Sequence, residues 1–178
     1  YDGFFLRTEV GARLERERWF VEGEVIDARV VGETIGAPLN TTLVNAAEPV
    51  HALVGLRLSD GGASAPTLRL GVQTLDLGGR RLVARNRWRN TTNTFMGARL
   101  DLPGAGGRRT IAFAFSPLQR LPFDTAGMEE ADVVIDRASS ERLFLGVFHA
   151  FGVWPAEAYL FHLDEGDSGG VPTRDRRL

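Results

Sequence analysis

Apolar and charged side chains alternate every second residue over long stretches of this sequence. Between residues 4 and 15 the even positions are mostly apolar, whereas the odd positions carry Arg7, Glu9, Arg13 and Glu15. Successive side chains of a β-strand point to opposite faces, so this spacing predicts a strand with one apolar and one charged face. An all-β fold follows if the pattern continues.

The pattern does continue, interrupted by segments rich in Gly, Pro and Asn, of which residues 36–49 are the longest before the middle of the chain. Short polar turns favour antiparallel pairing of neighbouring strands. About eight strands are predicted, at residues 4–15, 19–25, 50–58, 68–73, 96–102, 109–115, 142–151 and 156–163.

Alternation alone fits two kinds of protein. A soluble barrel or sandwich, for example a carbohydrate- or lipid-binding module, buries its apolar face; a transmembrane barrel turns that face to lipid and keeps a polar lumen. Strands of about 9 to 11 residues suit a tilted membrane crossing. Aromatic residues near strand ends are predicted to form interfacial girdles, although ordinary core positions would also explain them: Trp19, Phe20, Phe148, Phe151, Trp154, Tyr159 and Phe161.

The charge composition excludes some functions. All 21 basic residues are Arg, set against 23 carboxylates, so no nucleic-acid-binding surface is indicated. The chain has no Cys, which removes thiol chemistry and Cys-ligated zinc. His149 and His162 fall on different predicted strands with no carboxylate at ligand spacing, so neither a metal nor a cofactor is expected. Since the sequence opens at Tyr1 without an initiator Met, we expect a fragment of a longer protein.

Arginines are concentrated between residues 68 and 99. If the middle of this stretch is extended, Arg81, Arg85, Arg87 and Arg89 share one face, where guanidinium groups could bind carboxylates of a polyuronate. The alternative is that the arginines of the stretch neutralise nearby carboxylates in a lumen or on a solvated face: Asp76, Asp101, Glu22 and Glu24.

The same stretch carries a family resemblance. Its motifs are Leu68-Arg69-Leu70-Gly71-Val72-Gln73, Arg80-Arg81-Leu82-Val83-Ala84-Arg85-Asn86, Trp88-Arg89-Asn90 and Thr94-Phe95-Met96-Gly97-Ala98-Arg99. They resemble the bacterial alginate export family of outer-membrane porins, most closely over residues 49–99. The resemblance implies one antiparallel up-and-down transmembrane β-barrel domain, of which residues 1–178 form a part, in the outer membrane of a Gram-negative bacterium.

By position, the resemblance also implies a set of residues that line the lumen or its entrance. Val72 departs from the pattern because the family usually has Arg there. The implied function is a channel, not an enzyme, for an alginate-like anionic polysaccharide, with outer-membrane lipid and periplasmic secretion components as further partners. The implied lining residues are Arg69, Gln73, Arg81, Arg85, Arg87, Arg89 and Arg99.

A competing motif lies near the end of the chain. Residues 166–170, Gly-Asp-Ser-Gly-Gly, match the nucleophile motif of trypsin-like serine proteases, and His51, Asp101 and Ser168 occur in the protease order. However, only ten residues follow Ser168, and that fold needs further strands after its nucleophile. A turn between strands is the simpler interpretation.

Residues 116–140 interrupt the alternation with two prolines, a glycine and an acidic pair. This stretch is too long for a periplasmic turn. We predict a long extracellular loop, which either folds toward the lumen or lies on the surface.

Overall fold

The fold is one antiparallel sheet, seen in a computed structural model that describes residues 4–32, 39–80, 83–85 and 89–166. Eight strands follow in the order β1-β2-β3-β4-β5-β6-β8-β9, and the two-residue β7 pairs with β6. The all-β, up-and-down prediction is confirmed. The strands are β1 (Phe4–Glu15), β2 (Trp19–Val31), β3 (Asn45–Arg57), β4 (Thr67–Gln73), β5 (Phe95–Pro103), β6 (Arg109–Gln119), β7 (Arg137–Ala138), β8 (Arg142–Ala150) and β9 (Glu157–Glu165).

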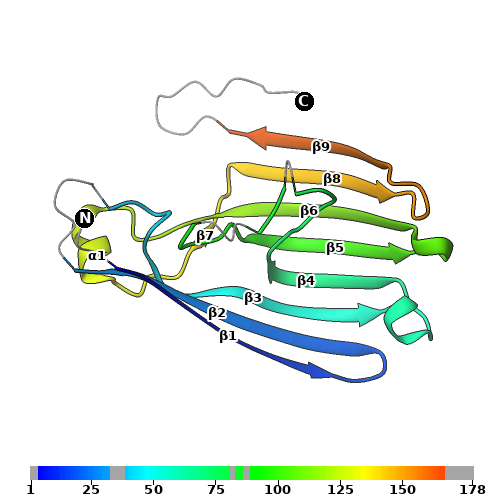
Figure 1. Ribbon diagram of the computed structural model, residues 1–178, viewed down its shortest axis with the longest axis horizontal. Helices are drawn as coiled ribbons and strands as arrows, with labels where there is room; N and C mark the ends of the chain where they lie inside the picture. Colours follow the sequence, from blue (N-terminus) through cyan, green and yellow to red (C-terminus); the bar gives the residue numbers. More distant parts are fainter. Residues whose placement is uncertain (1–3, 33–38, 81–82, 86–88, 167–178) are drawn as a thin grey trace.

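The connections differ in length at the two ends of the sheet (Figure 1). At one end lie the short turns after β1, β3, β5 and β8, which include the 3-10 turns Gly62–Ser64 and Ala105–Gly107. The three longer connections join strand ends at the opposite end of the sheet: residues 32–44, 74–94 and 120–136, the last of which contains the helix α1 (Thr125–Glu130). Short turns at one end and long loops at the other are typical of outer-membrane barrels.

The two faces of the sheet have opposite chemistry. One, here called the outer face, exposes large apolar side chains, with Val10 69% and Leu160 72% exposed. The other, the inner face, carries charged residues on β1–β5 and phenylalanines on β5–β9. A soluble binding module would bury its Leu/Val face, so this arrangement is that of a transmembrane barrel wall.

Residues 74–94, here called the inner segment, connect β4 to β5, and their described parts lie against the inner face. Leu75 and Leu77 are 0% and 5% exposed and, with Val83, form one core cluster with phenylalanines of β6 and β8. At the centre of the cluster, the ring centroids of Phe113 and Phe115 lie 5.3 Å apart. The core of this chain is therefore on the inner face, beneath a loop.

Four of the predicted interfacial aromatics belong to this inner side instead, including Tyr159, whose ring stacks on Phe161 with centroids 5.1 Å apart. Phe20 and Phe148 are 1% and 2% exposed, and Phe161 packs against the core cluster. Phe20 shares its face with Glu22, and the Arg13 guanidinium lies 3.8 Å from the Phe20 ring centroid. The prediction was wrong for these rings because each occupies a strand position whose side chain points to the inner face. That position, and not nearness to a strand end, decides which face a side chain occupies.

Strand β3 begins five residues earlier than the predicted strand. Ala47 has φ 51° and donates its N–H to Asp27 Oδ1 at 3.1 Å, and the register with β2 shifts around it. Such a bulge tolerates Pro49 inside the strand. It also leaves Asn45 and Glu48 both buried, at 4% and 2% exposure.

Replacing Phe113 with Ala should destabilise the wall strongly. The side chain is 6% exposed, and Gly146 opposite it leaves room for the ring, since a Cβ there would lie 2.3 Å from Phe113. We expect a loss of about 3–5 kcal/mol in the free energy of unfolding, measured by urea titration of the full-length protein in detergent micelles. Phe123→Ala, at a residue 66% exposed, is the control and should cost under about 0.5 kcal/mol. Equal losses in both variants would contradict the assigned core.

Candidate functional site: the inner face

Two predicted lining arginines share one carboxylate. Arg69 on β4 and Arg99 on β5 are register partners on the inner face. Arg69 Nε donates to Asp101 Oδ2 at 3.1 Å, and Arg99 Nη2 donates to Asp101 Oδ1 at 2.6 Å. Because a guanidinium carries five N–H donors, this sharing leaves donor capacity for a further anion.

Arg85 holds the inner segment to the other side of the sheet. Its Nη1 donates to Glu24 Oε2 at 3.0 Å, its Nη2 lies 3.3 Å from Glu9 Oε2, and its backbone N–H donates to Asp76 Oδ1 at 2.6 Å. The hydrogen bond with Glu24 raises the pKa of the Arg85 guanidinium, so it stays charged. Arg85 therefore works as a clamp between a loop and β1–β2.

The other arginines of the stretch are placed less fully. Arg81 and Arg87 lie outside the described residues, and the described parts of the inner segment contain no strand. Arg89 is exposed, and its carbonyl accepts a hydrogen bond from Arg7 Nη1 at 2.9 Å. For Arg69, Arg85 and Arg99, the interpretation as neutralising pairs agrees with the observed contacts.

A polar cavity of about 270 Å³ opens beside these arginines. Gln73 borders it, is 1% exposed, and has no hydrogen-bond partner at either Oε1 or Nε2 among the described residues. His51 borders it too, with Nδ1 2.7 Å from Glu22 Oε1 and Nε2 2.9 Å from Thr74 Oγ1. The cavity is lined by Glu22, His51, Leu53, Arg69, Gln73, Thr74, Asp76, Arg99 and Arg109.

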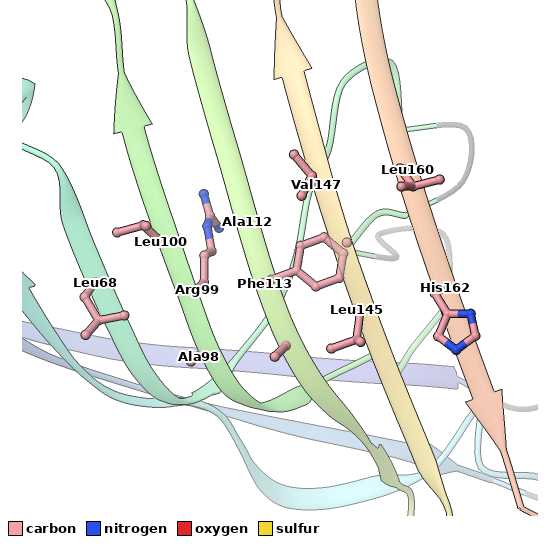
Figure 2. A pocket seen from close by; sticks show the side chains of 12 residues that line it. Leu68, Ala98, Arg99, Leu100, Ala112, Phe113, Leu145, Val147, Leu160 and His162 are labelled. Carbon is pink, nitrogen blue, oxygen red and sulfur yellow. The ribbon is translucent and has the colours of Figure 1, made fainter.

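A second, larger hollow is on the outer face (Figure 2). It measures about 540 Å³ and its walls are mainly aliphatic, with Leu68, Leu100, Val147 and Leu160 around small alanines. His162 lies at its edge. With so few polar groups it cannot recognise a polysaccharide, and it belongs to the apolar outer face.

The long connections are fastened to one another at their end of the sheet. Asn90 Nδ2 donates to the Leu43 carbonyl at 2.7 Å, and Arg120 Nε donates to the Thr92 carbonyl at 3.1 Å. Asp136 accepts from Asn45 Nδ2 at 3.1 Å and from Leu121 N at 2.8 Å, while Glu48 Oε2 accepts from Asp136 N. These hydrogen bonds therefore join all three connections to one another on the inner face.

Sequence reasoning missed these fastening residues. Asn45 and Glu48 were assigned to a connection, and Asp136 to the 116–140 loop. The available signal was a lone Asp directly after Val133-Val134-Ile135, but nothing in a single sequence pairs it with Asn45 91 positions away.

Docking of residues 120–136 should weaken as pH rises. Burial raises the pKa of the Asp136 carboxyl from an ordinary 3.8 to about 6, and Glu48 from β3 and Arg120 after β6 face it. Because the pKa of Asp136 is higher in the docked state than in the undocked state, docking is most stable below pH 3.8. Docking then loses stability as the pH rises to about 6. We expect about tenfold stronger protection at pH 5 than at pH 7, measured by hydrogen exchange of amides 121–136 after correction for intrinsic rates. Asp136→Asn should make the profile shallower, and the buried Glu48 carboxyl beside it keeps the rest of the slope; an unchanged slope in that variant would contradict the assignment.

The protease arrangement is not formed by its described members. His51 contacts Glu22 and Thr74, whereas Asp101 binds Arg69 and Arg99. Ser168 lies outside the described residues. Within the described ranges, no three His, Asp or Glu side chains group to hold a metal ion, and no helix has the length and apolar character to cross a membrane.

Comparison with known proteins identifies the family. The model of the alginate export family matches residues 4–170, which is nearly the whole chain. No curated protein and no solved structure matches this chain. The family consists of transport proteins, not enzymes, and its role is polysaccharide export across the outer membrane of Gram-negative bacteria. This single antiparallel sheet with an apolar outer face and a charged inner face therefore belongs to the alginate export family of outer-membrane porins.

Proposed function

We propose that the full-length protein passes an alginate-like polyuronate through a lumen walled by the inner face and narrowed by the inner segment. The observation that carries the proposal is the pair Arg69 and Arg99, which share Asp101 beside a polar cavity. Guanidinium groups bind carboxylates in bidentate geometry, and nearby carboxylates keep the binding weak enough for release. No covalent step is required.

The proposed lumen-lining set keeps the residues implied by the family resemblance. Arg69, Gln73 and Arg99 lie on the inner face, and Arg85 narrows it from the inner segment. The proposal extends to Arg81, Arg87 and Arg89, whose part in the lumen rests on their positions in the sequence.

The end with the long connections would face the cell exterior. The lengths of the three connections support this orientation, since outer-membrane barrels carry short turns on the periplasmic side. Residues 116–140 would then contribute to the extracellular entrance, although their first four residues continue β6. Periplasmic secretion components would meet the short-turn end.

Single-channel conductance in planar bilayers tests the proposal. The full-length protein should form a channel whose current oligogalacturonate blocks more strongly than neutral oligosaccharides of equal length. The double variant Arg69→Ala/Arg99→Ala should weaken the block about tenfold or more. Arg18→Ala is the control, because the Arg18 side chain is 67% exposed at a short turn, where it pairs with Asp60. A channel blocked equally by neutral and acidic oligosaccharides would refute the polyuronate assignment.

A further inference from the structure

We infer that the Gln73 amide hydrogen-bonds hydroxyl groups of the substrate and so lets the channel distinguish a polyuronate from other polyanions. This inference rests on the proposed function and adds to it a residue that sets specificity. Arginines attract any anion, whereas the amide of Gln73 recognises a different part of the substrate.

The first observation is the state of the Gln73 side chain. Gln73 is 1% exposed, and within the part of the chain that the structure describes both Oε1 and Nε2 lack a hydrogen-bond partner. Buried polar atoms without partners destabilise a fold, and the great majority of them are paired in native proteins. An amide with both polar atoms unpaired beside a cavity is therefore matched to something that enters the cavity.

The second observation is the position of this amide relative to the arginines. Along the inner face, Gly71 and Gly97 pair with each other and separate Gln73 from Arg69 and Arg99. Glycines place no side chain in that row, and all three polar residues line the same cavity. A bound unit can thus present a carboxylate to the guanidinium groups and a second polar group to Gln73.

The chemistry of the amide selects the second group. An amide offers a donor at Nε2 and an acceptor at Oε1, and a hydroxyl can satisfy both, because it donates and accepts. A carboxylate or phosphate only accepts, so it leaves Oε1 unpaired. Sites built to hydrogen-bond a hydroxyl discriminate strongly against analogues that lack it. The preferred ligand is a sugar acid with a hydroxyl near its carboxylate.

The test compares two blockers of the same charge in the full-length channel: oligogalacturonate, which has hydroxyls, and oligoacrylate, which has carboxylates but neither hydroxyl nor amide groups. In Gln73→Met, which keeps the side-chain length and removes both polar atoms, the concentration for half block by oligogalacturonate should rise about tenfold. The value for oligoacrylate should stay within about twofold. Unfolding in urea should show no loss of stability, because two unpaired buried atoms are removed. Gln119→Met, at an exposed end of β6, is the matched control and should change neither value.

The outcomes separate the inference from the proposed function. If oligogalacturonate does not block the wild-type channel, the proposed function is wrong. If it blocks the wild type, but Gln73→Met leaves that block unchanged or weakens both blockers by the same factor, the role of Gln73 is overturned.

Discussion

Replacing Arg85 with Ala should release the inner segment and widen the lumen. Arg85 binds Glu24 and Glu9 across the sheet, and its side chain is only 12% exposed. Removing one partner of a largely buried ion pair leaves the carboxylates uncompensated, so docking should weaken by about 2–4 kcal/mol. We expect a higher single-channel conductance and a noisier open state, measured in planar bilayers, together with weaker oligogalacturonate block.

Arg80→Ala is the matched control for this experiment. Arg80 lies in the same segment and pairs with Asp76 at 3.0 Å, but its side chain is 54% exposed, so the pair should contribute under about 1 kcal/mol. The double variant Arg85→Ala/Glu24→Ala should recover part of the docking, because it removes one stranded carboxylate. A wild-type conductance in Arg85→Ala would show that the hydrophobic residues alone hold the segment.

Replacing Gly97 with Ala should prevent the wall from assembling correctly. Gly97 has φ +155°, and a Cβ there would lie 2.1 Å from the Ala114 carbonyl oxygen. Its register partner Gly71 has φ +125° and an equally close approach to the Ala52 carbonyl oxygen, at 2.3 Å. Backbone atoms cannot move aside as a flexible side chain can, so we expect a loss of about 3 kcal/mol or more. Urea unfolding in micelles and heat-modifiable gel mobility would measure it.

Gly23→Ala on β2 provides the comparison for Gly97. A Cβ at Gly23 would meet nothing within 4 Å, so this substitution should be neutral or slightly stabilising. If Gly97→Ala folds as well as Gly23→Ala, the close approach of β5 to β6 is not as described.

The sequence was most informative where structure depends on local alternation. Strand β1 has the predicted bounds, residues 4–15, because its pattern of apolar and charged positions is regular. The start of β3 was missed because Pro49 suggested a loop, whereas a bulge at Ala47 keeps the strand going. Nothing local announces a bulge whose stabilising partner, Asp27, lies 20 residues away.

The sequence predicted which residues form the candidate site better than it predicted where they lie. Arg69, Gln73 and Arg99 lie on one face, as strand parity requires. Arg85 instead sits on a loop, because Leu75, Leu77 and Val83 pack on the phenylalanines of the inner face and so hold this segment out of the sheet. Its carboxylate partners come from β1 and β2, more than 60 positions away, which periodicity cannot show.

The pairing pattern also sets an order of events during assembly. In the path from β1 to β6, every strand pairs with its neighbour in the sequence, so the wall can grow hairpin by hairpin with small loop-closure costs. The inner segment is different, because Arg85 meets Glu9 from 76 positions away and its apolar residues need β6 and β8. These partners are in place only after most of the wall has formed. The channel should therefore pass through an open, unconstricted stage, and its narrowing is the last step of folding.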